Sequence, residues 1–261
     1  MGKLRYLVIF ICCLSQNILS QQYEITYEVI FQPRLGDTLK LKDYYALKFN
    51  LETKESLFAS LGEDDAINVS VYKNFKKDDF VKYETILNNL YSINYQFDAN
   101  SWDLINVKKN ILGYQCNKAE ISFGNRKWEA WYTTDISFYD GPYKFSHLPG
   151  IIIDIYSLDG EYRFKGIAIQ KKENIQILKP KSIHFKSIEK EQDFKSGIIK
   201  DPASLYRNQM MQLKSNNMGV SIKYDGKEIT QKETEQKIVD DFEKWRGNHN
   251  NPIEKGYTWI R

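Results

Sequence analysis

Apolar and polar residues alternate along many short stretches of this chain, and a period of two residues predicts β-strands. Residues 23–31 (YEITYEVIF) alternate and are rich in β-branched and aromatic side chains. Further strands are predicted at residues 44–51, 52–58, 66–75 and 80–87. The pattern favours a mainly β protein, built on a curved antiparallel sheet or half-barrel.

Short turn sequences connect several of the predicted strands. Residues 124–126 contain a glycine between two strand-like runs, which is typical of a hairpin. Asp159–Gly160 and Asp225–Gly226 are stronger signals, because the central residues of a tight hairpin must tolerate positive φ. These turns predict antiparallel neighbours in the sheet.

The pattern changes to helical spacing near the end of the chain, and it predicts two peripheral α-helices. The first follows Asp201 and Pro202, and the second begins at Thr230, where Glu233 completes a capping box. Between the strands and these helices, residues 171–200 hold eight lysines and four acidic residues. We expect the solvated side of edge strands there, since lysine deters strand addition; a basic ligand surface is the alternative.

Residues 1–20 have the form of a secretory signal peptide, with a basic start, a short apolar run and a cut after Ser20. An N-terminal membrane anchor is the alternative, but the run is shorter than a bilayer span. We therefore expect a secreted or periplasmic protein of the cell envelope, with residues 21–261 as a single domain and no transmembrane segment in the mature chain.

Charge and cysteine content narrow the function classes. The net charge of the whole chain is only +3, which disfavours nucleic acid as a partner. Outside residues 1–20 the only cysteine is Cys116, so no disulfide can form within one mature chain. We expect Cys116 to be a small buried side chain.

The densest motif lies at residues 131–157 (WYTTDISFYDGPYKFSHLPGIIIDIYS). Gly141–Pro142 and Pro149–Gly150 have turn chemistry, with Leu148 between them. We interpret residues 140–150 as a structural crossover that places aromatic rings beneath the sheet. Catalysis would instead require convergent titratable groups.

Residues 111–155 carry the pieces GYQCNKA, AWYTTDI, GPYKF and LPGI in that order, and in this respect the chain resembles the GLPGLI family of exported Bacteroidota proteins. The resemblance implies export and a β-rich fold but no reaction. His147 stands where the family has its first glycine, and Ile151 and Ile152 stand where it has Leu and Ile. Histidine there matters if the backbone needs positive φ.

The aromatic content of the same segment favours a non-catalytic module that binds a ligand or a partner. Trp131, Tyr139, Tyr143 and His147 are the candidate ligand-binding residues. The pattern is similar to that of half-barrels whose concave face holds apolar ligands, so we expect an apolar or peptide-like ligand, or an outer-membrane protein partner. No catalytic residue, metal ligand or cofactor is predicted.

An envelope hydrolase is the alternative function. It would use a carboxylate pair among Asp135, Asp140 and Asp154, which folding could bring to the spacing of glycosidase acids. No serine-hydrolase elbow, P-loop or dinucleotide fingerprint occurs in the sequence.

Overall fold

The computed structural model describes residues 21–62, 66–87, 89–97, 102–216, 221, 223–224, 226–258 and 260. The predicted signal peptide, residues 1–20, lies outside this part of the chain. The elements follow one another along the chain as β1 (Gln22–Phe31), β2 (Leu41–Asn50), β3 (Glu55–Ser60), β4 (Val69–Asn74), β5 (Asp79–Ile86), β6 (Asn89–Asn94), β7 (Trp102–Ile111), β8 (Tyr114–Phe123), β9 (Arg126–Thr133), β10 (Ile151–Ser157), β11 (Tyr162–Lys172), β12 (Ile183–His184), α1 (Ile188–Lys200), α2 (Ser204–Ser215), β13 (Lys223–Tyr224), β14 (Lys227–Glu228) and α3 (Gln231–Asn248).

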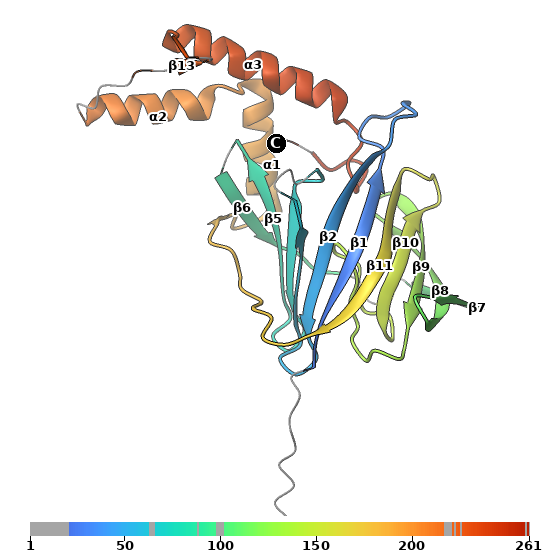
Figure 1. Cartoon of the computed structure of the whole chain (residues 1–261). Helices are drawn as coiled ribbons and strands as arrows, with labels where there is room; N and C mark the ends of the chain where they lie inside the picture. The colour runs from blue at the N-terminus through green and yellow to red at the C-terminus, as the bar shows by residue number, and fades with distance from the viewer. Residues whose placement is uncertain are drawn as a thin grey trace, which may run out of the picture.

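One open, strongly curved sheet dominates the described part of the chain (Figure 1). Its twelve strands run in the order β12-β6-β5-β4-β3-β2-β1-β11-β10-β9-β8-β7. The pairings are antiparallel except for the short β12, which runs parallel to β6. Sequential hairpins build each half, and the first strand joins the halves by pairing with β2 and β11. The predicted mainly β, curved antiparallel sheet is therefore confirmed.

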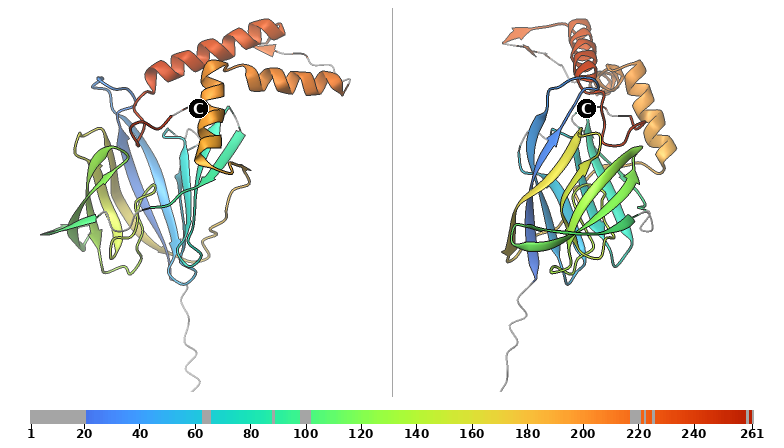
Figure 2. Two further views of the ribbon diagram at one scale, coloured as in Figure 1. Left: turned by 180° about the vertical axis from the view of Figure 1, so that it is seen from behind. Right: turned by 90° about the vertical axis from the view of Figure 1, so that its right-hand side faces the viewer.

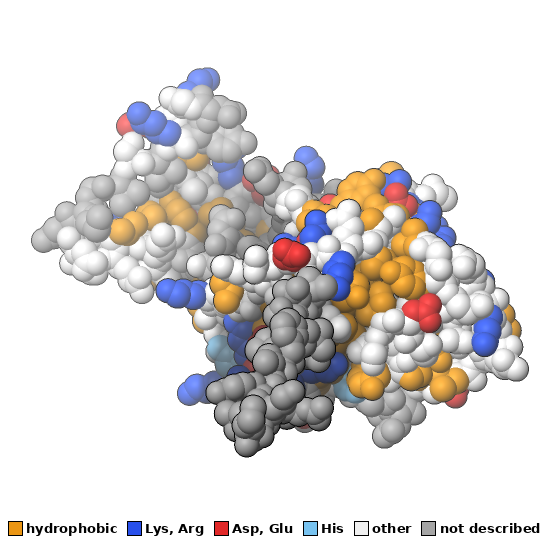
Figure 3. All heavy atoms as spheres, turned by 60° about the horizontal axis from the view of Figure 1, so that its bottom comes forward, with side chains coloured by type: hydrophobic (Ala, Val, Ile, Leu, Met, Phe, Trp, Pro, Cys, Tyr) orange, Lys and Arg blue, Asp and Glu red, His pale blue; other side chains and the backbone are white. Residues whose placement is uncertain are grey.

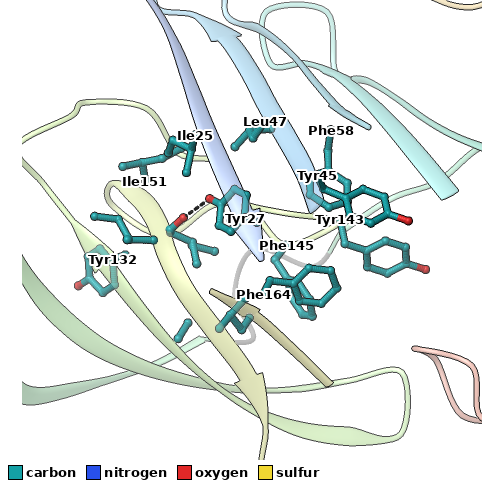
Figure 4. Packing of buried hydrophobic residues seen from close by; sticks show 14 of the residues in the cluster. Ile25, Tyr27, Tyr45, Leu47, Phe58, Tyr132, Tyr143, Phe145, Ile151 and Phe164 are labelled. Atoms are coloured by element: carbon teal, nitrogen blue, oxygen red, sulfur yellow. Dashed lines mark hydrogen bonds between the residues drawn. The ribbon is translucent and has the colours of Figure 1, made fainter. Parts of the chain in front are cut away.

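The inner face of the sheet holds the main hydrophobic core (Figure 4). Tyr27 shows how the core is ordered, because its hydroxyl donates to the carbonyl of Ile152 on the facing strand β10. Its ring packs edge-on against Phe58, with the ring centroids 6.2 Å apart. Phe58 in turn meets Phe164 at 6.1 Å. Rings from β1, β3 and β11 thus interlock across the curve, and aromatic pairs of this kind favour edge-to-face contact.

The connection between β9 and β10 fills the concave side. Phe138 stacks on Phe49 of β2 at 4.8 Å between ring centroids, and Phe145 meets Trp128 of β9 at 4.8 Å. Both phenylalanines are fully or almost fully buried. The connection therefore places aromatic rings beneath the sheet, as the sequence predicts, and these rings contact strands from both halves. The concave side is packed with this chain's own rings.

Three helices gather at one end of the sheet in the described part of the chain, one more than predicted (Figure 2). α2 and α3 occupy the two predicted positions, and α3 begins with the predicted capping box of Thr230 and Glu233. α1 lies within the lysine-rich segment for which edge strands were predicted, so the prediction is wrong for residues 188–200. The short β12 in the same segment is an exposed edge strand, so the prediction holds at Ile183–His184. No helix among the described residues is long and apolar enough to cross a membrane.

The predicted hairpins are confirmed where the structure describes them. Phe123 pairs with Arg126, and Gly124 and Asn125 between them both have positive φ. In the Asp159–Gly160 turn only the glycine has positive φ, 73°. Around the third turn β13 pairs with β14, although Asp225 itself is outside the described residues.

Candidate functional site

A large cavity lies between helix α2 and the end of the sheet where β5, β6 and the edge strand β12 lie side by side, and we call it the α2 groove. Its volume is about 740 Å³. Cavities of several hundred Å³ are the usual size for sites that hold small organic ligands. The pockets at the inner face of the sheet are far smaller, and the larger of them holds only about 30 Å³.

One wall of the groove is formed by strand residues and the other by helix residues, and in each case the spacing in the sequence puts them on one face. On the sheet side, Asn89 and Tyr91 are two positions apart in β6 and so point to the same face. On the helix side, Leu205, Gln209 and Gln212 recur at helical spacing and share one face of α2. Segments that are far apart in the sequence thus meet across one cavity.

The lining of the α2 groove is polar but uncharged. Five side chains carry carboxamides, namely Asn68, Asn89, Asn208, Gln209 and Gln212. Three carry hydroxyl groups, namely Thr85, Tyr91 and Tyr206. The remaining lining residues are aliphatic or proline, so no Asp, Glu, Lys, Arg or His is found among the described residues of the wall.

Two of the carboxamides support the wall itself. Asn68 bridges to the backbone of Thr85: its Nδ2 donates to the Thr85 carbonyl at 2.5 Å and its Oδ1 accepts from the Thr85 amide at 3.2 Å. Asn89 Nδ2 donates to the carbonyl of Leu87 at 3.3 Å. The contacts of Asn68 join the start of β4 to β5, and the contact of Asn89 closes the turn between β5 and β6.

The carboxamides on α2 are free to bind. Asn208, Gln209 and Gln212 are exposed, and no described residue contacts their side-chain amides by hydrogen bonding. Tyr206 lines the same groove, and its buried hydroxyl has no hydrogen-bond partner among the described residues. Since a carboxamide offers both donors and an acceptor, this helix face can match a ligand with many hydroxyl or amide groups.

The four predicted ligand-binding residues take different roles in the structure. Trp131 is only 6% exposed and lies under the ammonium group of Lys109, 3.9 Å from the ring centroid. Tyr143 is buried, and its hydroxyl donates to Glu254. Tyr139 is 52% exposed. Figure 3 brings the end of the sheet away from the helices forward and shows hydrophobic side chains at the surface. None of the three lines the α2 groove.

His147, the fourth, is wedged among aromatic rings. Its ring centroid lies 5.6 Å from that of Phe75, 5.8 Å from Phe80 and 5.9 Å from Phe97. Burial lowers the pKa of His147 below its ordinary value. Its φ is 68°, so this position does adopt the left-handed conformation that favours glycine. The packed imidazole holds a backbone conformation that a glycine would adopt without strain.

The motif residues of the crossover act as structural parts. Lys73 of β4 is fully buried beneath the crossover and pairs with the carboxylate of Asp140. Its ammonium group also donates to the carbonyls of Gly141 at 2.9 Å and Phe145 at 3.2 Å. Pro142 lies within this bonded segment and Pro149 follows it, and Leu148 is buried with it. Three hydrogen bonds from one cation therefore hold the bend.

The two motif glycines are required for space. A Cβ at Gly150 would stand 2.0 Å from the carbonyl oxygen of Thr133, and one at Gly141 would stand 2.7 Å from the side chain of Ile152. Neither glycine has positive φ. Gly150 is therefore required because the backbone of β9 passes too close for a side chain, and not because its turn needs positive φ.

The three candidate carboxylates are engaged separately. Asp140 pairs with Lys73, Asp154 pairs with Arg163 at 2.9 Å, and Asp135 is exposed. None of the three lines the α2 groove. Within the described residues, no group of three His, Cys, Asp or Glu side chains could hold a metal ion. Cys116 is buried as predicted, and burial raises the pKa of its thiol to about 11.

The sequence analysis missed the groove because its walls come from distant segments. A signal did exist: Asn208, Gln209 and Gln212 gather on one side of a predicted helix. Carboxamides are common on solvated helix faces, so this pattern alone does not indicate a groove. It does so only together with the edge of the sheet that lies opposite in the structure.

Comparison with known proteins finds a match between part of the chain and one protein family. Residues 70–193, slightly less than half of the chain, match the family described as the N-glycanase peptide, N-terminal domain, of PNGase F-II. No curated protein matches the chain.

Solved structures of PNGF-II share the fold. In two crystal forms, C2 and P21, PNGF-II matches with a TM-score of 0.51 and 18% sequence identity over 66% of this chain. The match covers 32% and 33% of the two PNGF-II chains, so this chain corresponds to about a third of that protein's length. An uncharacterized conserved protein from Thermus thermophilus matches at a TM-score of 0.38 and 8% identity, over 64% of this chain and 91% of that one.

Proposed function

We propose that this protein is a non-catalytic module that binds uncharged glycans in the α2 groove. The observation that carries the proposal is the lining: carboxamides and hydroxyl groups beside aliphatic walls, without a charged side chain among the described residues. A neutral saccharide presents hydroxyl groups along the edges of its rings and C–H groups on their faces. Such a ligand matches a wall that alternates amide and apolar contacts.

The lining also argues for binding over catalysis. General acid–base chemistry near neutral pH needs a group such as His, Asp or Glu within reach of the substrate. The ionisable side chains of the α2 groove are tyrosines, and burial raises the pKa of Tyr91 above its ordinary value. A side chain that stays neutral in this way can orient a hydroxyl group but does not exchange protons at physiological pH.

The comparisons support the choice of a glycan as the ligand. The matched domain belongs to a protein named an N-glycanase, and this chain corresponds to only about a third of the PNGF-II structures. A domain that presents or retains a glycan is consistent with both facts. Export to the cell envelope is part of the same proposal, because a protein that binds glycans of other organisms would encounter them outside the cell. The signal-like residues 1–20 and the GLPGLI resemblance support export.

Glycan binding can be tested with one helix residue. The Gln209→Ala variant removes an exposed carboxamide that has no partner within the described chain, so folding should be unaffected. Losing one hydrogen bond costs about 0.5–1.5 kcal/mol, so we expect the affinity for a neutral N-glycan to fall about twofold to twelvefold. A microarray of neutral and sialylated glycans would select the probe, and calorimetry would measure its affinity for both proteins.

The matched control is Gln170→Ala, which removes an equally exposed carboxamide from β11, outside the groove. This variant should bind the selected glycan like the parent protein. Equal losses in the two variants, or a microarray on which no neutral glycan binds, would contradict the proposal.

A further inference from the structure

Helix α2 is anchored at its beginning and loosely packed along the rest of its length. Pro202 and Ala203, in the short connection from α1, are buried. Within the helix itself only Met210 is buried. Figure 1 shows α2 leading sideways away from the end of α1. A helix that is held at one end can swing about that end, because few buried contacts oppose the movement.

The polar side-chain contacts of α2 with other elements reach α3 and not the sheet. Arg207 pairs with Glu235 of α3 at 3.1 Å, and Lys214 Nζ donates to Gln231 Oε1 of α3 at 2.8 Å. Among the described residues, no hydrogen bond or ion pair joins a side chain of α2 to a strand. The α2 groove, with a volume of about 740 Å³, lies between the helix and the sheet. Movement of α2 away from the sheet therefore breaks no such contact.

α2 also depends on docking for its own stability. It has 12 residues, no acidic residue lies in its first turn and, within the described chain, no side chain caps its N-terminus. Isolated helices shorter than about 12–15 residues are marginal in water, and an N-terminus without a cap weakens them further. When α2 leaves the sheet it should therefore lose backbone hydrogen bonds, and its amides should then exchange with solvent.

The docked position of α2 carries a penalty at Tyr206. The hydroxyl of this side chain is buried and has no hydrogen-bond partner among the described residues. A buried hydroxyl without a partner disfavours its state by about 5-fold to 150-fold relative to a state in which the hydroxyl is hydrated. Because Tyr206 lines the groove, movement of α2 away from the sheet would give this hydroxyl access to water. The penalty therefore favours opening.

We propose that α2 is a lid on the groove, that it opens about residues 201–203, and that the buried hydroxyl of Tyr206 keeps it easy to open. The role of the lid rests on the proposed function, because an open lid admits the glycan and lets a sugar hydroxyl group reach Tyr206. The movement itself needs no ligand, so it can be tested on the protein alone.

The Tyr206→Phe variant removes the hydroxyl and keeps the ring, so it should hold the lid closed. In the protein without ligand, we expect the amides of α2 to exchange about 5-fold to 150-fold more slowly than in the wild type, and those of β1 to be unchanged. The control is Tyr44→Phe, at an exposed tyrosine of β2, which should leave exchange in α2 at the wild-type rate. Exchange in α2 that is unchanged or faster in Tyr206→Phe would overturn the proposal.

Glycan association separates the lid from the ligand contacts. If the lid must open first, Tyr206→Phe should slow association of the glycan selected on the microarray by about the factor measured by exchange, because the open state is less populated. Gln209→Ala should instead speed dissociation, since it removes a contact of the bound state. Slower exchange with an unchanged association rate would overturn the lid, because α2 would then move without controlling entry. A protein that binds no glycan would contradict the proposed function, and exchange in α2 would still decide whether the helix opens.

Discussion

Lys73 is a lysine without exposed surface, and its ammonium group holds the crossover of residues 140–150 from beneath. A buried charge is tolerated only when it is paired and its other hydrogen bonds are satisfied. Here the carboxylate of Asp140 supplies the opposite charge, and two backbone carbonyls accept the remaining protons. The bend that carries the motif thus depends on one residue of another strand.

Replacing this lysine should be strongly destabilising. The Lys73→Met variant leaves the Asp140 carboxylate buried without its cation, which typically costs about 3–5 kcal/mol. We expect a loss of that size in the free energy of unfolding measured with urea, and a change of about 0.5 kcal/mol or less for the exposed Lys127→Met. In Lys73→Met/Asp140→Leu part of the loss should return, because no uncompensated charge remains. Equal stability of the first two variants would show that the pair does not hold the crossover.

Sequence reasoning identified the crossover residues as structural but could not assign the reason for each. Gly150 is required because the backbone at Thr133 passes close to its Cα, and His147 adopts positive φ among three phenylalanine rings. Both facts depend on neighbours brought near by folding. The glycine and proline signals report that a bend exists, whereas the contacts that shape it are non-local.

At the scale of elements, helix α1 is attached to the sheet by a crossed pair of buried salt bridges. Glu191 and Lys195 are one turn apart on α1, and Lys82 and Glu84 are two positions apart on β5, so each pair points to one side of its own element. Glu191 meets Lys82 at 2.9 Å, and Lys195 meets Glu84 at 2.7 Å. The two acids balance the two lysines.

This attachment should weaken in acid. Burial alone would raise the pKa of Glu191, but the charges of Lys82 and Lys195 outweigh burial and lower it from 4.5 to about 2. A carboxylate with a lowered pKa contributes stability that is fully present above about pH 4.5 and is lost as the pH falls toward 2. Urea unfolding of the wild type and of Glu191→Gln should therefore differ by about 3–5 kcal/mol at pH 6, and the difference should shrink below pH 4. A difference that does not change with pH would contradict this role.

Helix α1 could not be predicted from local signals in the sequence. Alternating strands and the capping box of α3 are local signals, and the structure confirms them. In α1 the buried positions include Glu191 and Lys195, which look like solvated surface in the sequence. Their partners lie more than a hundred residues earlier, on β5. Because the buried face of α1 carries charged residues that pair with β5, the lysine-rich segment does not show the apolar pattern of an amphipathic helix.

For the molecule as a whole, the three helices differ in how closely they pack on the rest of the fold. α1 packs on β6 through Phe194 and Tyr91, whose ring centroids are 4.8 Å apart. α2 and α3 each bury a single side chain, Met210 and Phe242. One wall of the α2 groove therefore belongs to a loosely packed helix and the other to the sheet. Segments with few buried contacts open at low free-energy cost.

Amide hydrogen exchange would connect this difference in packing to the proposed ligand. Without glycan, the amides of α2 and α3 should exchange faster than those of β1, whose neighbours pair with it on both sides. A neutral glycan bound across the groove should slow exchange in α2, because the ligand stabilises the closed arrangement by mass action. The slowing should be weaker in Gln209→Ala, measured at the same glycan concentration, and unchanged in Gln170→Ala. If the glycan instead protects the segment around Tyr139 and leaves α2 unaffected, the ligand binds at the opposite end of the sheet, and the carboxamides of α2 are ordinary solvated surface.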